Sequence, residues 1–147
     1  MTRILSTTMK WTSAAAFLTV LTITTATSAF AQQQVVRGKI PFNFTVGEKT
    51  LPAGEYEVVS LGDQMIKVQS ADGQNAALIA GLQSHDDPAG RSWLEFDQIG
   101  DSYFLRRVLS SSTRSMNTDF AMGRSEKTVR EHQANLRTDA KVMVAMM

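Results

Sequence analysis

The stretch TLPAGEYEV, residues 50–58, decides the fold class that this sequence predicts. Pro52 fixes its own φ at about −65°, which suits the second position of a tight turn. Gly54 is expected to supply a backbone angle that other residues resist, and Leu51 to cover the core before a strand begins. The residues from Glu55 onward are rich in strand formers. The stretch therefore predicts a turn that leads into a β-strand, and not a binding or catalytic site.

Two extended segments precede this turn, at residues 35–40 and 42–46, where apolar residues alternate with a period of two. Pro41 separates them and cannot donate to a strand ladder, so it marks a sheet edge or a bulge. Residues 47–50 then turn the chain.

The dipeptide Asp72-Gly73 is typical of a two-residue type I′ turn. A loop at this position pairs Ile66 with Ile79. The same register pairs Val68 with Ala77, so that the four apolar side chains share one face. We therefore expect an antiparallel hairpin here.

A second hairpin is predicted at Gly100-Asp101, where glycine comes first, as a type II′ turn prefers. This loop pairs Phe96 with Leu105 on one face. On the other face it pairs Glu95 with Arg106, which are oppositely charged.

The C-terminal part of the chain changes character. Ser125 is expected to cap a short helix over residues 126–134, with Glu126 in its first turn and Val129 as its main inward contact. Residues 141–145 have strand composition and would add a last strand. The fold class predicted for the whole chain is all-β, an antiparallel β-sandwich or partly closed barrel of about seven or eight strands with one short C-terminal helix.

The first thirty-one residues have the pattern of a cleaved secretory signal peptide. Arg3 and Lys10 form a basic start, and an apolar run follows at residues 14–21. Ala29-Phe30-Ala31 is a small-x-small cleavage pattern, with Gln32 as the expected new N-terminus. The apolar run is interrupted by Thr and Ser before it reaches the length of a membrane span, so we expect no membrane span after processing. The product is then periplasmic or extracellular.

Removal of residues 1–31 leaves 116 of the 147 residues, a size that favours a single β domain over residues 32–147. The chain contains no Cys, which excludes disulfides, thiol nucleophiles and zinc–thiolate sites. Residues 32–102 hold 5 basic and 10 acidic side chains, whereas residues 103–147 hold 8 basic and 4 acidic ones. The basic end either docks on the acidic body of the domain or binds an anionic partner. The first alternative is favoured because it neutralises both halves.

Residue types used in catalysis gather only at Ser84-His85-Asp86-Asp87. Neighbours along an extended chain point in alternating directions, which argues against a triad, and Pro88 follows, as expected for a solvated hairpin loop. Binding of a divalent metal by the imidazole and the two carboxylates is the alternative. His132 is expected to be exposed on the helix. We therefore expect no catalytic residue, no metal site and no cofactor.

Nucleic-acid binding is not expected, because the mature chain is not basic and Arg106 already has a predicted partner. Trp93 falls on the Glu95 face of its strand, opposite Val108, where it would belong to a second core layer or to an exposed binding face.

Three blocks carry a resemblance: IPFNFTVGEKTLPAGEYEV (40–58), GDSYFLRRV (100–108) and GRSEK (123–127). The chain resembles, over residues 37–130, a family of small exported bacterial all-β proteins of unknown function with F-x-V-G-x-x-x-L-P-A-G-x-Y and G-D-x-Y-F-L blocks. That resemblance implies a secreted all-β domain and carries over no catalytic or binding residue.

The function expected from these observations is that of an exported, non-catalytic interaction or envelope-associated domain, whose partner is a protein or an envelope component. The alternatives are a β-barrel carrier of a small ligand and, third, a small hydrolase. The absence of a nucleophile–base arrangement in the sequence argues against the hydrolase.

The cleavage pattern leads to a first prediction. N-terminal sequencing of the exported protein should begin at Gln32, because signal peptidase cleaves after a small-x-small pattern. An exported product that still contains Trp11 would contradict this prediction.

Overall fold

The computed structural model describes residues 35–133 and 139–147. The signal peptide and the cleavage residues predicted at 29–32 lie outside this part of the chain. The described residues form eleven strands, one 3₁₀ helix and one α-helix. The strands are β1 (Val35–Ile40), β2 (Phe44–Val46), β3 (Lys49–Leu51), β4 (Gly54–Ser60), β5 (Met65–Ser70), β6 (Ala76–Ala80), β7 (Leu82–Gln83), β8 (Ser92–Ile99), β9 (Ser102–Leu109), β10 (Thr118–Asp119) and β11 (Asp139–Met146), and the helices are η1 (Arg114–Met116) and α1 (Arg124–His132).

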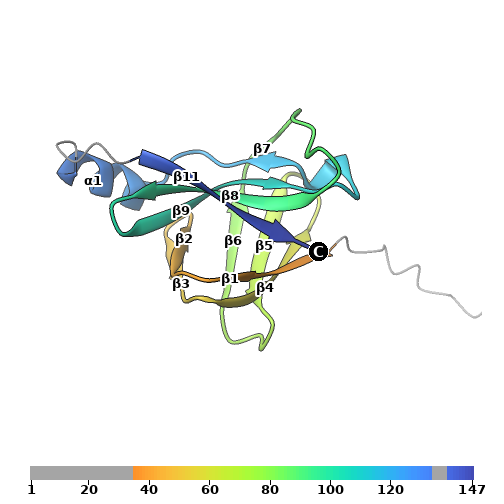
Figure 1. The fold of residues 1–147 in the computed structure, drawn as a ribbon, viewed down its shortest axis with the longest axis horizontal. Helices are drawn as coiled ribbons and strands as arrows, with labels where there is room; N and C mark the ends of the chain where they lie inside the picture. The colour runs from red at the N-terminus through yellow and green to blue at the C-terminus, as the bar shows by residue number, and fades with distance from the viewer. Residues whose placement is uncertain (1–34, 134–138) are drawn as a thin grey trace, which may run out of the picture.

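The strands form two facing sheets (Figure 1). One has four antiparallel strands in the order β1-β4-β5-β6. The other contains β11-β8-β9-β10-β7, with β2 and β3 attached because β2 pairs with β9. The expected all-β sandwich with one short helix is confirmed, and the described residues do not form a closed barrel. The strand number exceeds the expected seven or eight, because strands as short as β7 and β10 carry too few residues to show an alternating pattern.

The register of the first predicted hairpin is confirmed. Ile66 pairs with Ile79 and Val68 with Ala77 between β5 and β6. The loop is longer than the predicted two-residue turn, because the hydrogen bond from Ser70 N to Asn75 O closes it over residues 71–74. The Asp72 carboxylate organises this loop by accepting hydrogen bonds from Ser70 Oγ (2.5 Å) and Gln74 N (3.0 Å).

The predicted register of the second hairpin is confirmed near the turn, but it is wrong farther from the turn. Phe96 pairs with Leu105 as expected, and Gly100 has a φ of +58°, as the first position of a type II′ turn requires. A β-bulge between Glu95 and Phe96 shifts the rest of the register by one residue. Glu95 therefore lies opposite Arg107 and not opposite Arg106.

The same bulge changes the partner of Trp93. This side chain lies opposite Leu109, whereas the sequence predicted Val108, which pairs with Leu94. Trp93 is half-buried. Its Nε1 atom is covered and has no hydrogen-bond partner among the residues that the structure describes.

The LPAG turn is held by hydrogen bonds that the sequence did not suggest. Tyr56 Oη donates to Pro52 O at 2.7 Å, and Ala53 N donates to Asn43 Oδ1 at 2.9 Å. Leu51 is completely buried, as expected. The prediction for Gly54 was wrong: its φ lies outside the left-handed region, because the residue already belongs to β4 and pairs with Ile40.

Aromatic side chains from both sheets fill the core. Phe44 from β2 contacts Tyr56 from β4 edge to face, with ring centroids 5.0 Å apart, and contacts Phe96 from β8 in the same manner, at 5.4 Å. All three side chains are almost fully buried. Such rings each bury about 150–250 Å² and supply much of the packing energy between the sheets.

The C-terminal segment closes one corner of the sandwich. Strand β11 pairs along the whole of β8, which extends the predicted strand of residues 141–145 to 139–146. Beyond it, the backbones of Met147 and Arg37 exchange two hydrogen bonds of 2.7 and 2.9 Å. These bonds connect the seven-stranded sheet to β1 of the other sheet.

The α1 helix begins two residues before its predicted start, and residue 134, the predicted end, lies outside the described residues. Ser125 is not the N-cap: Gly123 holds that position. The main inward contact is Glu126 and not Val129, because the buried Glu126 carboxylate pairs with Arg106. An ion pair to the sheet thus replaces the apolar contact that the sequence predicted.

Gly81, between β6 and β7, lies too close to β10 to carry a side chain. A Cβ atom there would lie 2.5 Å from Asp119 O and 2.4 Å from Thr118 Cγ2. Gly81→Ala should lower the free energy of unfolding by about 1–3 kcal/mol, since backbone atoms must move to make room. Urea denaturation measures this change.

Gly54→Ala is the matched control. A Cβ atom at Gly54 would meet its nearest neighbour, Tyr56 Cε2, at an ordinary 3.6 Å, so stability should change by less than about 0.5 kcal/mol. A larger effect at Gly54 than at Gly81 would contradict this account of the packing.

Candidate interaction surface

The Ser84–Asp87 segment forms a solvated loop. Ser84 is buried and its Oγ accepts a hydrogen bond from Asp86 N, whereas His85, Asp86 and Asp87 are exposed. Asp86 pairs with Arg107 at 2.5 Å, and Asp87 accepts a turn hydrogen bond from Ala89 N. Within residues 35–133 and 139–147, no three His, Asp or Glu side chains gather in a way that could hold a metal ion. Asp86 and Asp87 are thus each engaged by a neighbouring residue.

His132 lies on the exposed side of the last turn of α1, as expected, with Nδ1 2.7 Å from Thr128 O. No helix among the described residues is long and apolar enough to cross a membrane.

The charged side chains of the seven-stranded sheet largely bind one another. Arg107 contacts Asp119 and Asp86, both at 2.5 Å, and Glu95 at 3.8 Å, and Lys141 donates to Glu95 at 2.6 Å. Burial alone would lower the pKa of Arg107, but the nearby carboxylates of Asp119, Glu95 and Asp86 outweigh burial and raise it. Each charged side chain of this cluster therefore has an oppositely charged neighbour within 4 Å.

Several ion pairs join the basic second half of the chain (residues 103–147) to the acidic first half (residues 32–102). Four basic residues of the second half contact carboxylates of the first half: Arg106 and Arg130 meet Asp97, Arg107 meets Asp86 and Glu95, and Lys141 meets Glu95. These pairs support the hypothesis that the basic end docks on the acidic body.

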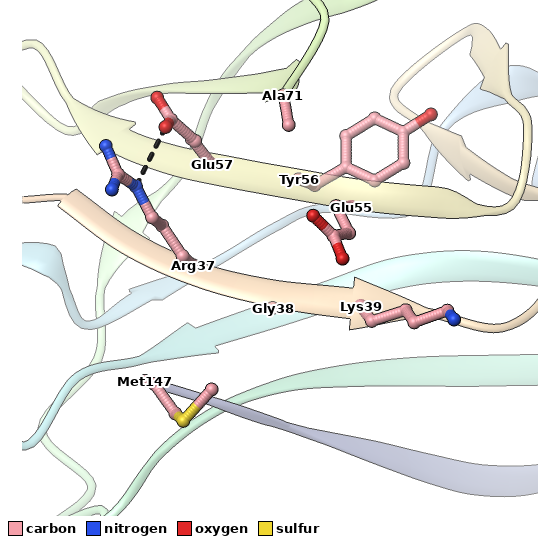
Figure 2. Close-up of a pocket in the computed structure, with 8 residues that line it drawn as sticks. All are labelled: Arg37, Gly38, Lys39, Glu55, Tyr56, Glu57, Ala71 and Met147. Carbon is pink, nitrogen blue, oxygen red and sulfur yellow. Dashed lines mark ion pairs between the residues drawn. The ribbon is translucent and has the colours of Figure 1, made fainter.

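One surface hollow lies where β1, β4 and the Met147 end meet (Figure 2). It has a volume of about 370 Å³. Arg37 and Glu57 form an ion pair of 2.8 Å across the strands, and the Lys39 ammonium group points away from this pair. Tyr56 also lines it, but its hydroxyl group is engaged by Pro52 O, and burial raises its pKa. Charges of both signs line this hollow, and Arg37 and Glu57 are engaged with each other.

A larger hollow, of about 700 Å³, runs along β6. It is lined by β6 itself, by the turn Val46–Lys49 and by Lys67. In the described part of the chain, β6 is the last strand of its sheet, and the β2–β3 hairpin lies beyond it (Figure 1). The hollow therefore follows an unpaired strand edge.

The hydrogen-bond pattern shows which backbone groups of β6 face this edge. Ser70 N bonds to Asn75 O, and Gly81 N bonds to Gln64 O, on either side of the β5–β6 ladder. Because bonded pairs alternate in an antiparallel ladder, Asn75, Ala77, Ile79 and Gly81 face β5. The N–H and C=O groups of the remaining residues point away from β5; these residues are Ala76, Leu78 and Ala80.

The side chains along this edge are apolar and exposed. Leu78 is 62% exposed at the centre of β6, and Leu82 is 73% exposed on the adjoining β7. β6 contains no charged residue and no Pro. Natural edge strands are usually protected against pairing with another chain by charge, Pro or a bulge, and here one lysine takes that role, since Lys49 Nζ donates to Ala76 O at 2.8 Å.

Glu48, at the rim of the hollow, faces away from β6 toward the helix. Its carboxylate accepts hydrogen bonds from Ser125 Oγ (2.7 Å), Arg124 N (2.7 Å) and Ser125 N (3.3 Å). These bonds lower the pKa of the Glu48 carboxyl group below its usual value of 4.5. The side chain thus caps α1 from a distant part of the chain, since Gly123 has no side chain with which to do so.

Sequence reasoning missed this surface. The hairpin register correctly placed Ile79 and Ala77 on the inner face, and therefore Leu78 on the outer face. It gave no indication that β6 ends its sheet, because that depends on which strands pair beyond the hairpin.

Comparison of the chain with protein-family models, with curated proteins and with solved structures gave no significant match.

The contact between Glu48 and α1 leads to a pH-dependent prediction. Because the folded state holds the pKa of Glu48 below 4.5, ionised Glu48 stabilises the fold above that pH, and the contribution is lost as the pH falls through the folded value. Glu48→Gln should therefore be less stable than the wild type at pH 7, and the difference should shrink on acidification. Urea denaturation at a series of pH values measures it.

Glu55→Gln is the control, because it removes the same charge from an exposed site on β4. It should change stability by less than about 0.5 kcal/mol throughout the series. A Glu48→Gln difference that stays constant or grows at low pH would refute the role of the carboxylate as a cap.

Proposed function

We propose that this protein is an exported, non-catalytic interaction domain that binds a protein or envelope component through the open edge of β6. The observation that carries the proposal is the 62% exposure of Leu78 at the centre of an uncharged edge strand. An exposed edge of this kind is a template for pairing with another chain. Export rests on the signal-peptide pattern of residues 1–31.

Two further observations support an interaction surface over the carrier and the hydrolase. Fully buried aromatic rings occupy the space between the sheets, where a carrier would hold its ligand. The Arg107 cluster, with its carboxylates, is engaged in internal ion pairs, and the Ser84 hydroxyl group lies beside Asp86 N and not beside a base. The partly open β6 edge thus remains the feature best suited to binding.

Site-specific photo-crosslinking tests this function. A photoreactive residue at position 78 of the full chain, expressed in its own cells, should give defined adducts in the exported fraction. The matched control is position 101, an exposed site at the tip of the β8–β9 turn, on the other sheet, which should give none. Equal labelling at both positions, or none at either, would overturn the proposal, as would a protein retained in the cytoplasm with residues 1–31 intact.

A further inference from the structure

Three charged side chains line the hollow along β6: Glu48, Lys49 and Lys67. Of the charged residues that line its hollow, Glu48 is turned toward α1, where its carboxylate accepts three hydrogen bonds. The other two are Lys49, at the Ala76 carbonyl, and Lys67, which lies opposite Leu78 on β5. Lys67 has no hydrogen bond or ion pair within the part of the chain that the structure describes. The edge therefore presents two ammonium groups beside apolar side chains.

We propose that the β6 edge binds an extended segment of a partner protein in which apolar and acidic residues alternate; this inference rests on the proposed function. The segment would pair with the outward N–H and C=O groups of Ala76, Leu78 and Ala80 as an added strand. Because successive side chains of a strand point to opposite faces, its apolar side chains would lie on the inner face with Ile79, and its carboxylates on the outer face, where they would reach Lys67. A strand paired along the five residues of β6 spans about 17 Å, at about 3.4 Å per residue.

A second copy of this chain fits the same edge less well. Symmetric antiparallel pairing about Leu78 would bond each Ala76 carbonyl to the partner's Ala80 N–H group and displace Lys49 from that carbonyl, as pairing with any other strand also does. It would also bring the lysines of both copies into one interface without adding a carboxylate of the hollow, because Glu48 is engaged by α1. The carboxylates of an acidic segment would instead be attracted to these lysines.

A synthetic peptide in which glutamate and valine alternate tests the inference by nuclear magnetic resonance titration of the full mature protein. The peptide should shift the amide signals of Ala76 to Ala80, and its affinity should fall with added salt, because exposed charges are screened. A peptide alternating lysine and valine should bind about tenfold more weakly or not at all, since like charges then face one another. N-methylation of the glutamate–valine peptide should abolish binding, since it removes backbone donors.

Protein variants locate the contact. Lys67→Glu should weaken binding of the glutamate–valine peptide about tenfold and favour the lysine–valine peptide instead. Leu78→Pro removes an N–H group that faces away from β5, so it should block pairing while sparing the β5–β6 ladder. Leu78→Thr keeps that N–H group and should retain binding, weakened less than by the proline. If Leu78→Pro fails to fold, Lys67→Glu and the N-methylated peptide still decide the question.

Three results would overturn the inference: equal binding of both peptides, signals shifted away from β6, or concentration-dependent dimerisation that shifts β6 signals without peptide. If any of these results is obtained but adducts still form at position 78 in cells, only the acidic-strand partner is refuted. The proposed interaction function is then still supported. Absence of such adducts, with peptide binding intact, would refute the cellular function but not the chemistry of the edge.

Discussion

The contact between Phe44 and Tyr56 is the interaction on which the rest of the structure depends. It joins the two sheets through an edge-to-face ring contact, and Phe96 makes a second such contact with Phe44. Tyr56 can be buried in this position only because its hydroxyl group finds a partner in Pro52 O, since an unpaired buried hydroxyl group would be costly. The LPAG turn therefore serves the core: it supplies Leu51 as a buried side chain and a carbonyl group as the acceptor for Tyr56.

Aromatic rings fill the core, and the charged side chains lie on the outer faces. Most of the charged side chains on the seven-stranded sheet form ion pairs there. Arg106 shows how far this pairing reaches, because its guanidinium group bonds to Asp97 on β8, to Phe120 O and to Glu126 on α1. The helix is thus held by an ion pair at Glu126 and by the Glu48 carboxylate at its start. A short helix held in this way needs little apolar surface of its own, which explains why Val129 is not its main anchor.

The four-stranded sheet is different, because one of its edges is covered and the other is not. Met147 bonds to Arg37 and covers part of the β1 edge, whereas the β6 edge presents outward backbone groups, the exposed Leu78 and two lysines. Open edges that carry no protection favour pairing with other chains. In this molecule Lys49 supplies limited protection, at the Ala76 carbonyl.

The sequence by itself determined the local features. Turn residues and alternating apolar residues predicted the β5–β6 register, the Phe96–Leu105 pair, the buried Leu51 and a short helix followed by a last strand, since each depends on neighbours close along the chain. Only the tertiary structure decided the rest. The bulge at Glu95 places this residue opposite Arg107 and not opposite Arg106. The Glu48 carboxylate caps a helix that begins 76 residues later in the chain. Strand β6 lies at the edge of its sheet. Each of these outcomes depends on which distant segments pack together, and hydrophobic periodicity carries no information about that choice.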